Sequence, residues 1–165
     1  MKILALVLVL TLISFFTFAK ENKSDKQYSI GLGLGSSYSG IGTNFSFLSK
    51  TDMKYISAGC IEYDSYNGAT CGFGVGWIMT DLFDTDSNKH GLGVYASLVG
   101  HESYYSYEGN GYTYKDKDIY GTGISYIYFM NGINASGFNF GASMHITNAE
   151  FEDSYGSFFQ VGYQF

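Results

Sequence analysis

The stretch 70–80, TCGFGVGWIMT, alternates a large apolar residue with a glycine along most of its length. The large residues are Cys71, Phe73, Val75, Trp77 and Met79. Successive side chains of a β-strand point to opposite faces, so a period of two predicts a strand with one bulky face and one nearly bare face. This stretch therefore favours an all-β fold.

The same period of two recurs along the rest of the chain. It is clear in the segments 28–35, 41–48, 91–100, 120–128, 137–147 and 155–165. Segment 55–61 alternates poorly, and we expect a strand there mainly from its spacing between its neighbours. The chain has 22 glycines, no proline and 19% aromatic residues, a composition that opposes long helices. Eight such segments in succession predict an eight-stranded antiparallel up-and-down β-barrel.

The first 19 residues have a different character from the rest. Lys2 supplies a positive charge, an unbroken apolar run follows, and Thr17 and Ala19 place small residues where a signal peptidase cleaves. We expect a signal peptide at 1–19, a short N-terminal periplasmic segment at 20–27 and the barrel at 28–165. Because residue 20 is Lys and not Cys, no lipoprotein anchor is expected.

The charges exclude some classes of function. Removing 19 residues from 165 leaves 146, which carry 8 Lys, no Arg and 15 acidic residues. An acidic chain without arginine is a poor candidate for binding nucleic acid. All 23 charged residues of the mature chain lie outside the eight segments, whereas a strand surface facing water would carry Lys and Glu. The bulky face is therefore expected to point outward into lipid, and the Gly- and Ser-rich face into a crowded lumen, as in a transmembrane barrel.

The lengths of the connections predict which end of the barrel is which, because membrane barrels have short periplasmic turns and longer external loops. We expect external connections at 36–40, 62–69, 101–118 and 148–154, and periplasmic turns at 49–54, 81–90 and 131–136. With this orientation, aromatic residues of the outer face gather near the periplasmic end and form a membrane girdle. They are Tyr28, Phe45, Phe47, Trp77, Tyr126, Tyr128, Phe138, Tyr163 and Phe165.

The chain ends in FFQVGYQF, residues 158–165, with apolar residues in alternation, an aromatic residue third from the end and Phe last. This ending resembles the terminal strand of small Gram-negative outer-membrane barrels, the class that includes the OmpA membrane domain and the OmpX and OmpW proteins. The resemblance implies export to the bacterial outer membrane and contact with its lipid and lipopolysaccharide. It also implies that the outer-membrane assembly machinery recognises Tyr163 and Phe165. We expect a monomer without a cofactor.

A second resemblance concerns catalysis. The stretch 145–148, HITN, is similar to the His-x-Ser-Asn stretch near the end of lipid A deacylases, where a histidine activates a hydroxyl. Thr147 would supply the hydroxyl here, and Glu150 or Glu152 could orient His145 only through folding of the loop. The alternative is a polar pair that fills the top of the lumen. The alternation of side chains along this strand points His145 and Thr147 inward, which favours the polar pair in the lumen.

No metal site is predicted. The turn 84–88, DTDSN, copies the first half of a calcium-binding loop, but Lys89 replaces the required glycine and Tyr95 stands where a bidentate Glu is needed. His90 and His101 have no second ligand at a metal-binding spacing. We interpret 84–88 as a solvated periplasmic turn.

Cys60 and Cys71 are expected to form a disulfide. They flank a connection centred on 65–66, so they fall near opposite positions of one hairpin, where Cβ atoms are about 4.5–5.5 Å apart. Export to an oxidising compartment favours the bond, and two free thiols are the alternative. Opposed residues share a face, so Cys60 must point outward with Cys71. That register points Ile56 and Ala58 outward and Tyr55 into the lumen.

The connection 101–118 carries the strongest functional signal. Tyrosines surround the turn sequence EGNG at 108–111, which would extend the flanking strands into a protruding hairpin. They are Tyr104, Tyr105, Tyr107, Tyr112 and Tyr114. Exposed tyrosines offer a large contact area at low entropic cost, as in recognition surfaces. The alternative is that they continue the aromatic belt of the barrel.

The expected function is therefore a structural or surface-interaction role in the outer membrane, and not that of an enzyme. An open, porin-like pore is disfavoured because eight strands leave a lumen only wide enough for side chains or one small ligand. One alternative is a lipid A-modifying hydrolase that uses His145 and Thr147. Another is a small carrier of an apolar compound in the lumen. The carrier is suggested by apolar residues of the inner face, which are Ile61, Ile78, Val99, Ile119, Ile127, Phe129 and Phe158.

Overall fold

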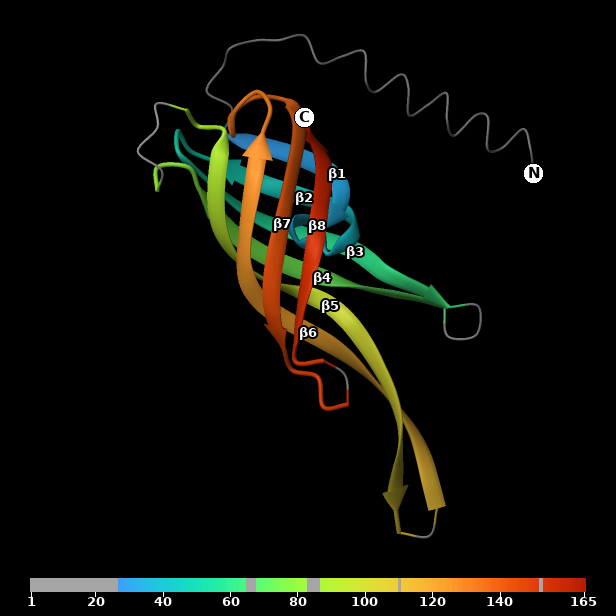
Figure 1. Ribbon diagram of the computed structural model, residues 1–165. Helices are drawn as coiled ribbons and strands as arrows, with labels where there is room; N and C mark the ends of the chain where they lie inside the picture. Colours follow the sequence, from blue (N-terminus) through green and yellow to red (C-terminus); the bar gives the residue numbers. More distant parts are fainter. Residues whose placement is uncertain (1–26, 65–67, 83–86, 110, 152) are drawn as a thin grey trace, which may run out of the picture.

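The computed structural model describes residues 27–64, 68–82, 87–109, 111–151 and 153–165 (Figure 1). The expected signal peptide at 1–19, nearly all of the segment 20–27 and most of the calcium-like turn at 84–88 lie outside these residues. Within the described part, no helix is long and apolar enough to cross a membrane.

The described strands close into one antiparallel barrel, which confirms the predicted fold (Figure 1). They are β1 (Tyr28–Gly35), β2 (Gly40–Leu48), β3 (Asp52–Asp64), β4 (Gly68–Met79), β5 (His90–Glu108), β6 (Gly111–Phe129), β7 (Gly137–Thr147) and β8 (Tyr155–Gln164). Each strand pairs with the next, and β1 pairs with β8. We call the end of the barrel with Tyr28 and Phe165 the termini end. The opposite end, from which the β5–β6 hairpin projects, is the hairpin end.

The two faces of the barrel differ as the period of two predicted. On β4, Phe73 and Val75 are 74% and 54% exposed on the outside. Ile41 on β2 and Phe159 on β8 are 72% and 85% exposed. Many of the inward side chains are small or amide-bearing, and Asn139 on β7 is 1% exposed. The outer face is thus apolar, and the polar groups of the barrel wall lie inside.

Two β-bulges interrupt the barrel near its hairpin end. In β3 the register shifts between Cys60 and Glu62, and in β5 it shifts between Leu98 and Gly100. A bulge sets two residues against one and so changes the face that later residues occupy. The period of two places Leu98 on the outer face, but this side chain is fully buried. That expectation was wrong because periodicity alone does not reveal the extra residue.

Beyond the second bulge, β5 and β6 continue as a two-stranded hairpin that projects past the barrel (Figure 1). The hairpin agrees with the turn sequence at 108–111, but these strands and β3 are longer than the segments 91–100, 120–128 and 55–61. The extensions include charged residues such as Glu102 and Asp116. The charged residues lie outside the predicted segments, but they are not confined to the connections, because the longer strands of the structure include several of them.

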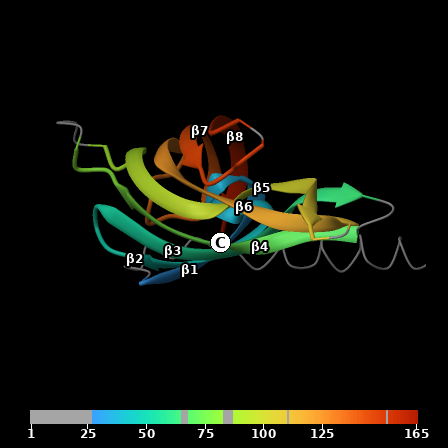
Figure 2. The same cartoon turned by 90° about the horizontal axis from the view of Figure 1, so that it is seen from below.

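The connection 36–40 lies at the hairpin end, on the same side as the other connections expected to be external, but it does not project from the barrel as a loop. Its residues form a short 3-10 helix, η1 (Ser36–Tyr38), which folds into the barrel and lies inside the ring of strands (Figure 2). We call Ser36–Ser39 the plug. Tyr38 is 1% exposed, and its hydroxyl donates to Asn139 Oδ1 at 3.2 Å and accepts from Asn139 Nδ2 at 2.9 Å.

Three further hydrogen bonds tie the plug to the barrel wall. The backbone N–H of Ser37 donates to Gln160 Oε1 at 3.3 Å, and Asn44 Nδ2 donates to the Ser37 carbonyl at 3.1 Å. The hydroxyls of Ser39 and Ser57 lie 2.8 Å apart. These bonds reach β2, β3 and β8, so the plug is held from several sides.

Glycine makes room for this segment. Gly35 and Gly40 bracket η1 with φ angles of 114° and 95°, which other residues rarely adopt. A Cβ atom on Gly33 would lie 2.6 Å from Cε2 of Tyr38, and one on Gly162 would collide with the Tyr38 hydroxyl. The bare inner face predicted from sequence is therefore where the Tyr38 ring packs.

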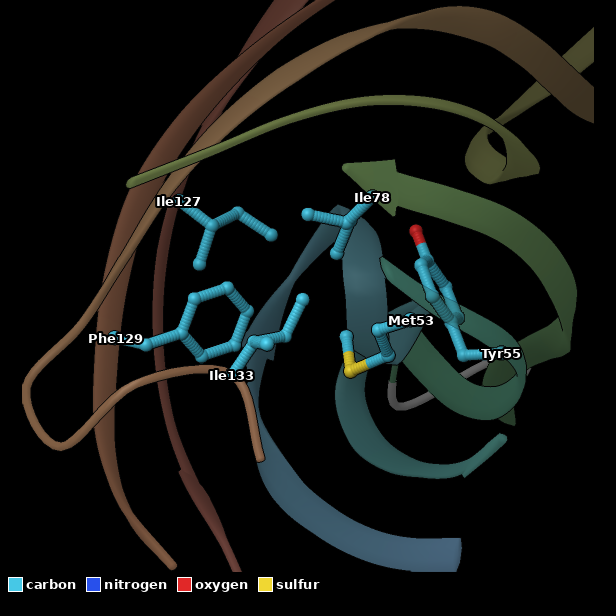
Figure 3. Packing of buried hydrophobic residues seen from close by; sticks show 6 residues of the cluster. All are labelled: Met53, Tyr55, Ile78, Ile127, Phe129 and Ile133. Atoms are coloured by element: carbon cyan, nitrogen blue, oxygen red, sulfur yellow. The ribbon is translucent and has the colours of Figure 1, made fainter. Parts of the chain in front are cut away.

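Apolar side chains fill the termini end of the lumen. Figure 3 shows the cluster of Met53, Tyr55, Ile78, Ile127, Phe129 and Ile133. Ile133 belongs to the predicted turn 131–136 and is fully buried, so the β6–β7 turn folds over this end of the barrel. This cluster and the plug both occupy the lumen.

Candidate functional site

The β5–β6 hairpin places its tyrosines on two faces. Tyr105 pairs with Tyr114 and Tyr107 with Tyr112, and the rings of each pair lie edge to face with centroids 5.4 Å apart. These four side chains are 45–77% exposed on the outer face of the hairpin. Tyr104 points to the opposite face. The predicted set of five therefore forms a four-residue outer patch, which we call the tyrosine patch, and one inward ring.

The inward face of the hairpin is fixed to the β7–β8 loop. The ring centroids of Tyr104 and Phe151 lie 4.6 Å apart. Glu102 is 2% exposed and accepts hydrogen bonds from the backbone N–H groups of Glu150 at 3.1 Å and Phe151 at 3.1 Å. Lys117 Nζ lies 3.4 Å from Glu102 Oε1 and donates to Glu150 Oε1 at 2.8 Å. We call Glu102, Lys117 and Glu150 the brace.

The brace shifts the titration of its own members. Burial alone would raise the pKa of Glu102. The N–H groups of Phe151 and Glu150, together with Lys117, lower this pKa by more than burial raises it, so it lies below its ordinary value. The hydrogen bond to Glu150 raises the pKa of Lys117. Desolvation opposes this shift, and the nearby carboxylate of Glu102 adds to it. Sequence reasoning missed the brace, because only the bulge in β5 turns Glu102 towards the loop.

The base of the outer hairpin face is polar. His101 Nε2 lies 3.1 Å from Ser103 Oγ, which donates to Asp116 Oδ1 at 2.9 Å. The other ring nitrogen of His101 lies 3.6 Å from Asp118 Oδ1. Among the residues that the structure describes, no group of three or more His, Cys, Asp and Glu side chains is arranged to hold a metal ion.

His145 and Thr147 both lie on the lumen side of β7, but they bind different partners. The Thr147 hydroxyl donates to the Asp153 carbonyl at 3.2 Å and accepts from the Ala149 N–H at 3.2 Å, so it shapes the β7–β8 loop. His145 Nδ1 lies 2.9 Å from the hydroxyl of Tyr95. Of the two acids considered, Glu150 belongs to the brace, and Glu152 lies outside the described residues.

His145 is held by a network that sequence reasoning did not find. Tyr95 donates to Ser143 Oγ at 3.3 Å, and both side chains are 3% exposed. The imidazole packs against the Phe158 ring with centroids 5.2 Å apart. Tyr95 comes from β5, Ser143 from β7 and Phe158 from β8. The alternation of each strand points these side chains inward, but only the register across the barrel brings them together.

A cavity of about 590 Å³ opens above His145, at the hairpin end of the barrel. Its lower wall includes Val99, Ile119 and Phe158, and its rim includes Phe151 and Asp153. Ile119 is 3% exposed, whereas Asp153 is exposed. The hairpin end therefore has a hollow lined by both apolar and polar side chains, with a carboxylate at its rim and an imidazole at its base.

The nine aromatic residues predicted as a girdle lie near the termini end, on the outside of the barrel, and several contact one another. Phe45 lies 6.0 Å from Tyr28 and 5.2 Å from Phe47, measured between ring centroids. Tyr163 lies 5.1 Å from Phe138 and 5.0 Å from Phe165. The remaining members pair with polar partners: Lys54 lies over Trp77, His90 Nδ1 lies 2.8 Å from the Tyr126 hydroxyl, and the rings of His90 and Tyr128 lie 5.1 Å apart.

The predicted disulfide is present. Cys60 and Cys71 are directly opposed in the β3–β4 register and are bonded to each other. Ile56 on the same strand is 56% exposed and Tyr55 is 3% exposed, which is the orientation that the disulfide required. The bond lies just before the bulge at Cys60/Glu62, where the ladder is about to lose its regular register.

These features define the chain as an eight-stranded, closed antiparallel β-barrel with an apolar outer face, a plugged lumen and a projecting hairpin. Comparison with protein-family models, with curated proteins and with solved structures finds no match.

Proposed function

We propose that this protein is a monomeric barrel of the bacterial outer membrane that presents the β5–β6 hairpin as a contact surface for a macromolecule outside the cell. The observation that carries the proposal is the tyrosine patch, whose four rings are exposed and paired on one face of a braced hairpin. In this orientation the termini end faces the periplasm and the hairpin end faces outward.

The outer face of the barrel supports a membrane location. Side chains such as Ile41, Phe73 and Phe159 are more than 70% exposed, and contiguous apolar surface of this kind is rare on soluble monomers. The aromatic side chains near the termini end suit a membrane–water interface, where rings with a polar tip sit well. Lipid and lipopolysaccharide would cover the apolar band, and the assembly machinery would recognise β8 through Tyr163 and Phe165.

The hairpin suits a recognition role because little entropy remains to be lost on binding. Tyrosine has few rotatable bonds for its area, and the edge-to-face pairs already restrict the rings. The brace fixes the base of the hairpin to the β7–β8 loop. A partner would therefore meet a surface that is largely organised beforehand.

Site-specific photo-crosslinking in intact cells tests this proposal. A photoreactive phenylalanine replaces Tyr107 in one variant and Tyr63 in the control, because Tyr63 is 80% exposed on the β3–β4 hairpin, away from the patch. We expect discrete adducts from position 107 that are lost when Tyr105, Tyr112 and Tyr114 are changed to Ser, and no such adducts from position 63. The same adducts from both positions, or none from position 107, would contradict a contact role for the patch.

The two alternatives have less support from the geometry. A lipid A-modifying hydrolase would need the Thr147 hydroxyl, which is engaged in the loop, to reach His145, which contacts Tyr95. Release of fatty acid from lipopolysaccharide by refolded protein is its test. A carrier would need room in a lumen that the plug and the apolar cluster already occupy. An apolar compound retained through detergent purification would support it.

A further inference from the structure

The cavity above His145 lies at the mouth of the barrel, and its lining combines apolar side chains with polar ones such as Thr147, Asp153 and Ser157. Its volume of about 590 Å³ lies within the range of roughly 300–1,000 Å³ usual for ligand pockets, which often form at the mouths of barrels. His145 at its base is 8% exposed, so it is a buried polar side chain next to an open volume. The lining comes from β5 to β8 and from the β7–β8 loop.

The hydrogen bonds of the network favour one tautomer of His145. The Tyr95 hydroxyl uses its single hydrogen to donate to Ser143 Oγ. In this arrangement its oxygen accepts from His145 Nδ1, which lies 2.9 Å away, and the hydrogen of the neutral imidazole is on Nδ1. In a neutral imidazole with Nδ1 protonated, Nε2 is a hydrogen-bond acceptor.

Nε2 points away from this network. None of the described residues forms a hydrogen bond with it. A Cβ atom on Gly156, a residue of the cavity wall, would lie 2.5 Å from Nε2, so the glycine at this position lets the imidazole pack against β8. The cavity therefore contains one fixed acceptor near its base.

The rest of the lining restricts the ligand further. Val99, Ile119 and Phe158 offer apolar contact between the base and the rim. Asp153 is the charged residue among the described lining side chains, and its carboxylate is exposed at the rim. An apolar body fits the walls, a hydrogen-bond donor fits Nε2, and an anion would be repelled at the entrance.

We propose that this mouth cavity binds a small apolar molecule with one hydroxyl or amine donor, which donates to His145 Nε2, and that it discriminates against anions of the same shape. Tyr95 and Ser143 are positioning residues, because they fix the tautomer of His145 without contacting the ligand. This site is separate from the tyrosine patch and does not depend on the hairpin having a partner.

Nitrogen NMR of imidazole-labelled protein in lipid nanodiscs tests the proposal, because the chain has three histidines. His90, near the termini end, and His101, on the outer face of the hairpin, serve as internal references. The probes are 1-naphthol, naphthalene and 1-naphthoate, which share a ring system and differ in donor and charge. Before any probe is added, we expect Nδ1 of His145 to carry the proton and Nε2 to be bare.

We expect 1-naphthol to shift the Nε2 signal of His145 in a saturable way and to leave His90 and His101 unchanged. Naphthalene and 1-naphthoate should bind at least several-fold more weakly. Asp153→Asn should narrow the difference between 1-naphthol and 1-naphthoate by about two- to fivefold, as expected for one exposed charge. Ser143→Ala frees the hydrogen of Tyr95, so a fraction of His145 should become protonated on Nε2, and the preference for 1-naphthol over naphthalene should fall.

The wild-type protein alone can overturn the proposal. A proton on Nε2 in the free protein would remove the acceptor. No saturable shift of His145 with 1-naphthol, or equal binding of 1-naphthoate, would show that the cavity lacks the proposed selectivity.

Discussion

Removal of the Tyr38 side chain is the most direct test of the plug. The ring is 1% exposed and packs where Gly33 and Gly162 leave room, so Tyr38→Ala would leave a cavity that rigid strands cannot close. Truncation of a buried aromatic residue to alanine costs about 3–5 kcal/mol, and we expect a loss of unfolding free energy in that range.

Tyr38→Phe separates packing from hydrogen bonding. It keeps the ring but removes the hydroxyl that both donates to and accepts from Asn139. Asn139 Oδ1 still accepts from Gln160 Nε2 at 3.3 Å, so only the Nδ2 donor is left without its acceptor. The cost of one buried unsatisfied group is about 1–3 kcal/mol, which places this variant between wild type and Tyr38→Ala.

Urea titration in lipid vesicles measures these differences, and Trp77, the single tryptophan, reports unfolding by fluorescence. Tyr63→Ala is the control, because this side chain is 80% exposed and its loss should cost no more than about 0.5 kcal/mol. Membrane conductance should stay at baseline in Tyr38→Ala, because the apolar cluster at the termini end remains. If Tyr38→Ala unfolds at the same urea concentration as Tyr63→Ala, Tyr38 does not pack inside the barrel.

Three further predictions concern location, the disulfide and pH. The protein should fractionate with the outer membrane and migrate faster on gels when unboiled, and deletion of Phe165 should reduce assembly but not synthesis; recovery of soluble periplasmic protein would contradict this. Thiol counting on denatured, unreduced protein should find no free cysteine. The double substitution Cys60→Ala, Cys71→Ala should lower the free energy of unfolding by at most about 3 kcal/mol, because the two residues are only 11 apart in sequence. Since folding lowers the pKa of Glu102, its contribution to the brace is complete above the ordinary Glu pKa of 4.5 and is lost as pH falls through the lower folded value. Hydrogen exchange at the Glu150 and Phe151 amides, corrected for the intrinsic effect of pH, should therefore accelerate on acidification of the wild-type protein. In Glu102→Gln the exchange of these amides should be fast at every pH. Equal protection of the amides in the variant and the wild type would rule out the brace.

Local pattern predicted most of the barrel. The alternation in 70–80 and its repeats defined the strand count and the orientation of the faces, because a period of two is a property of each strand alone. The cysteine pair supplied the register of β3, where alternation was weak, because two opposed residues must share a face. The turn sequence at 108–111 likewise predicted the hairpin from a few adjacent residues.

Features that depend on several strands could not be predicted in this way. Serines and glycines around Tyr38 are typical of a surface turn, and the inward path of the plug depends on bare glycines in β1 and β8 and on Asn139 in β7. The bulge at Leu98/Gly100 adds one residue without a local signal, yet it buries Leu98 and turns Glu102 towards the β7–β8 loop.

The sequence by itself determined that this chain is an all-β barrel with an apolar outer face, since strand periodicity and the placement of charge are local properties. Only the tertiary structure decided what fills the lumen, which nitrogen of His145 faces the mouth cavity and which hairpin face carries the tyrosine patch. Those outcomes depend on how strands far apart in the chain stand beside one another around a closed barrel, where a one-residue change of register exchanges the inner face for the outer one.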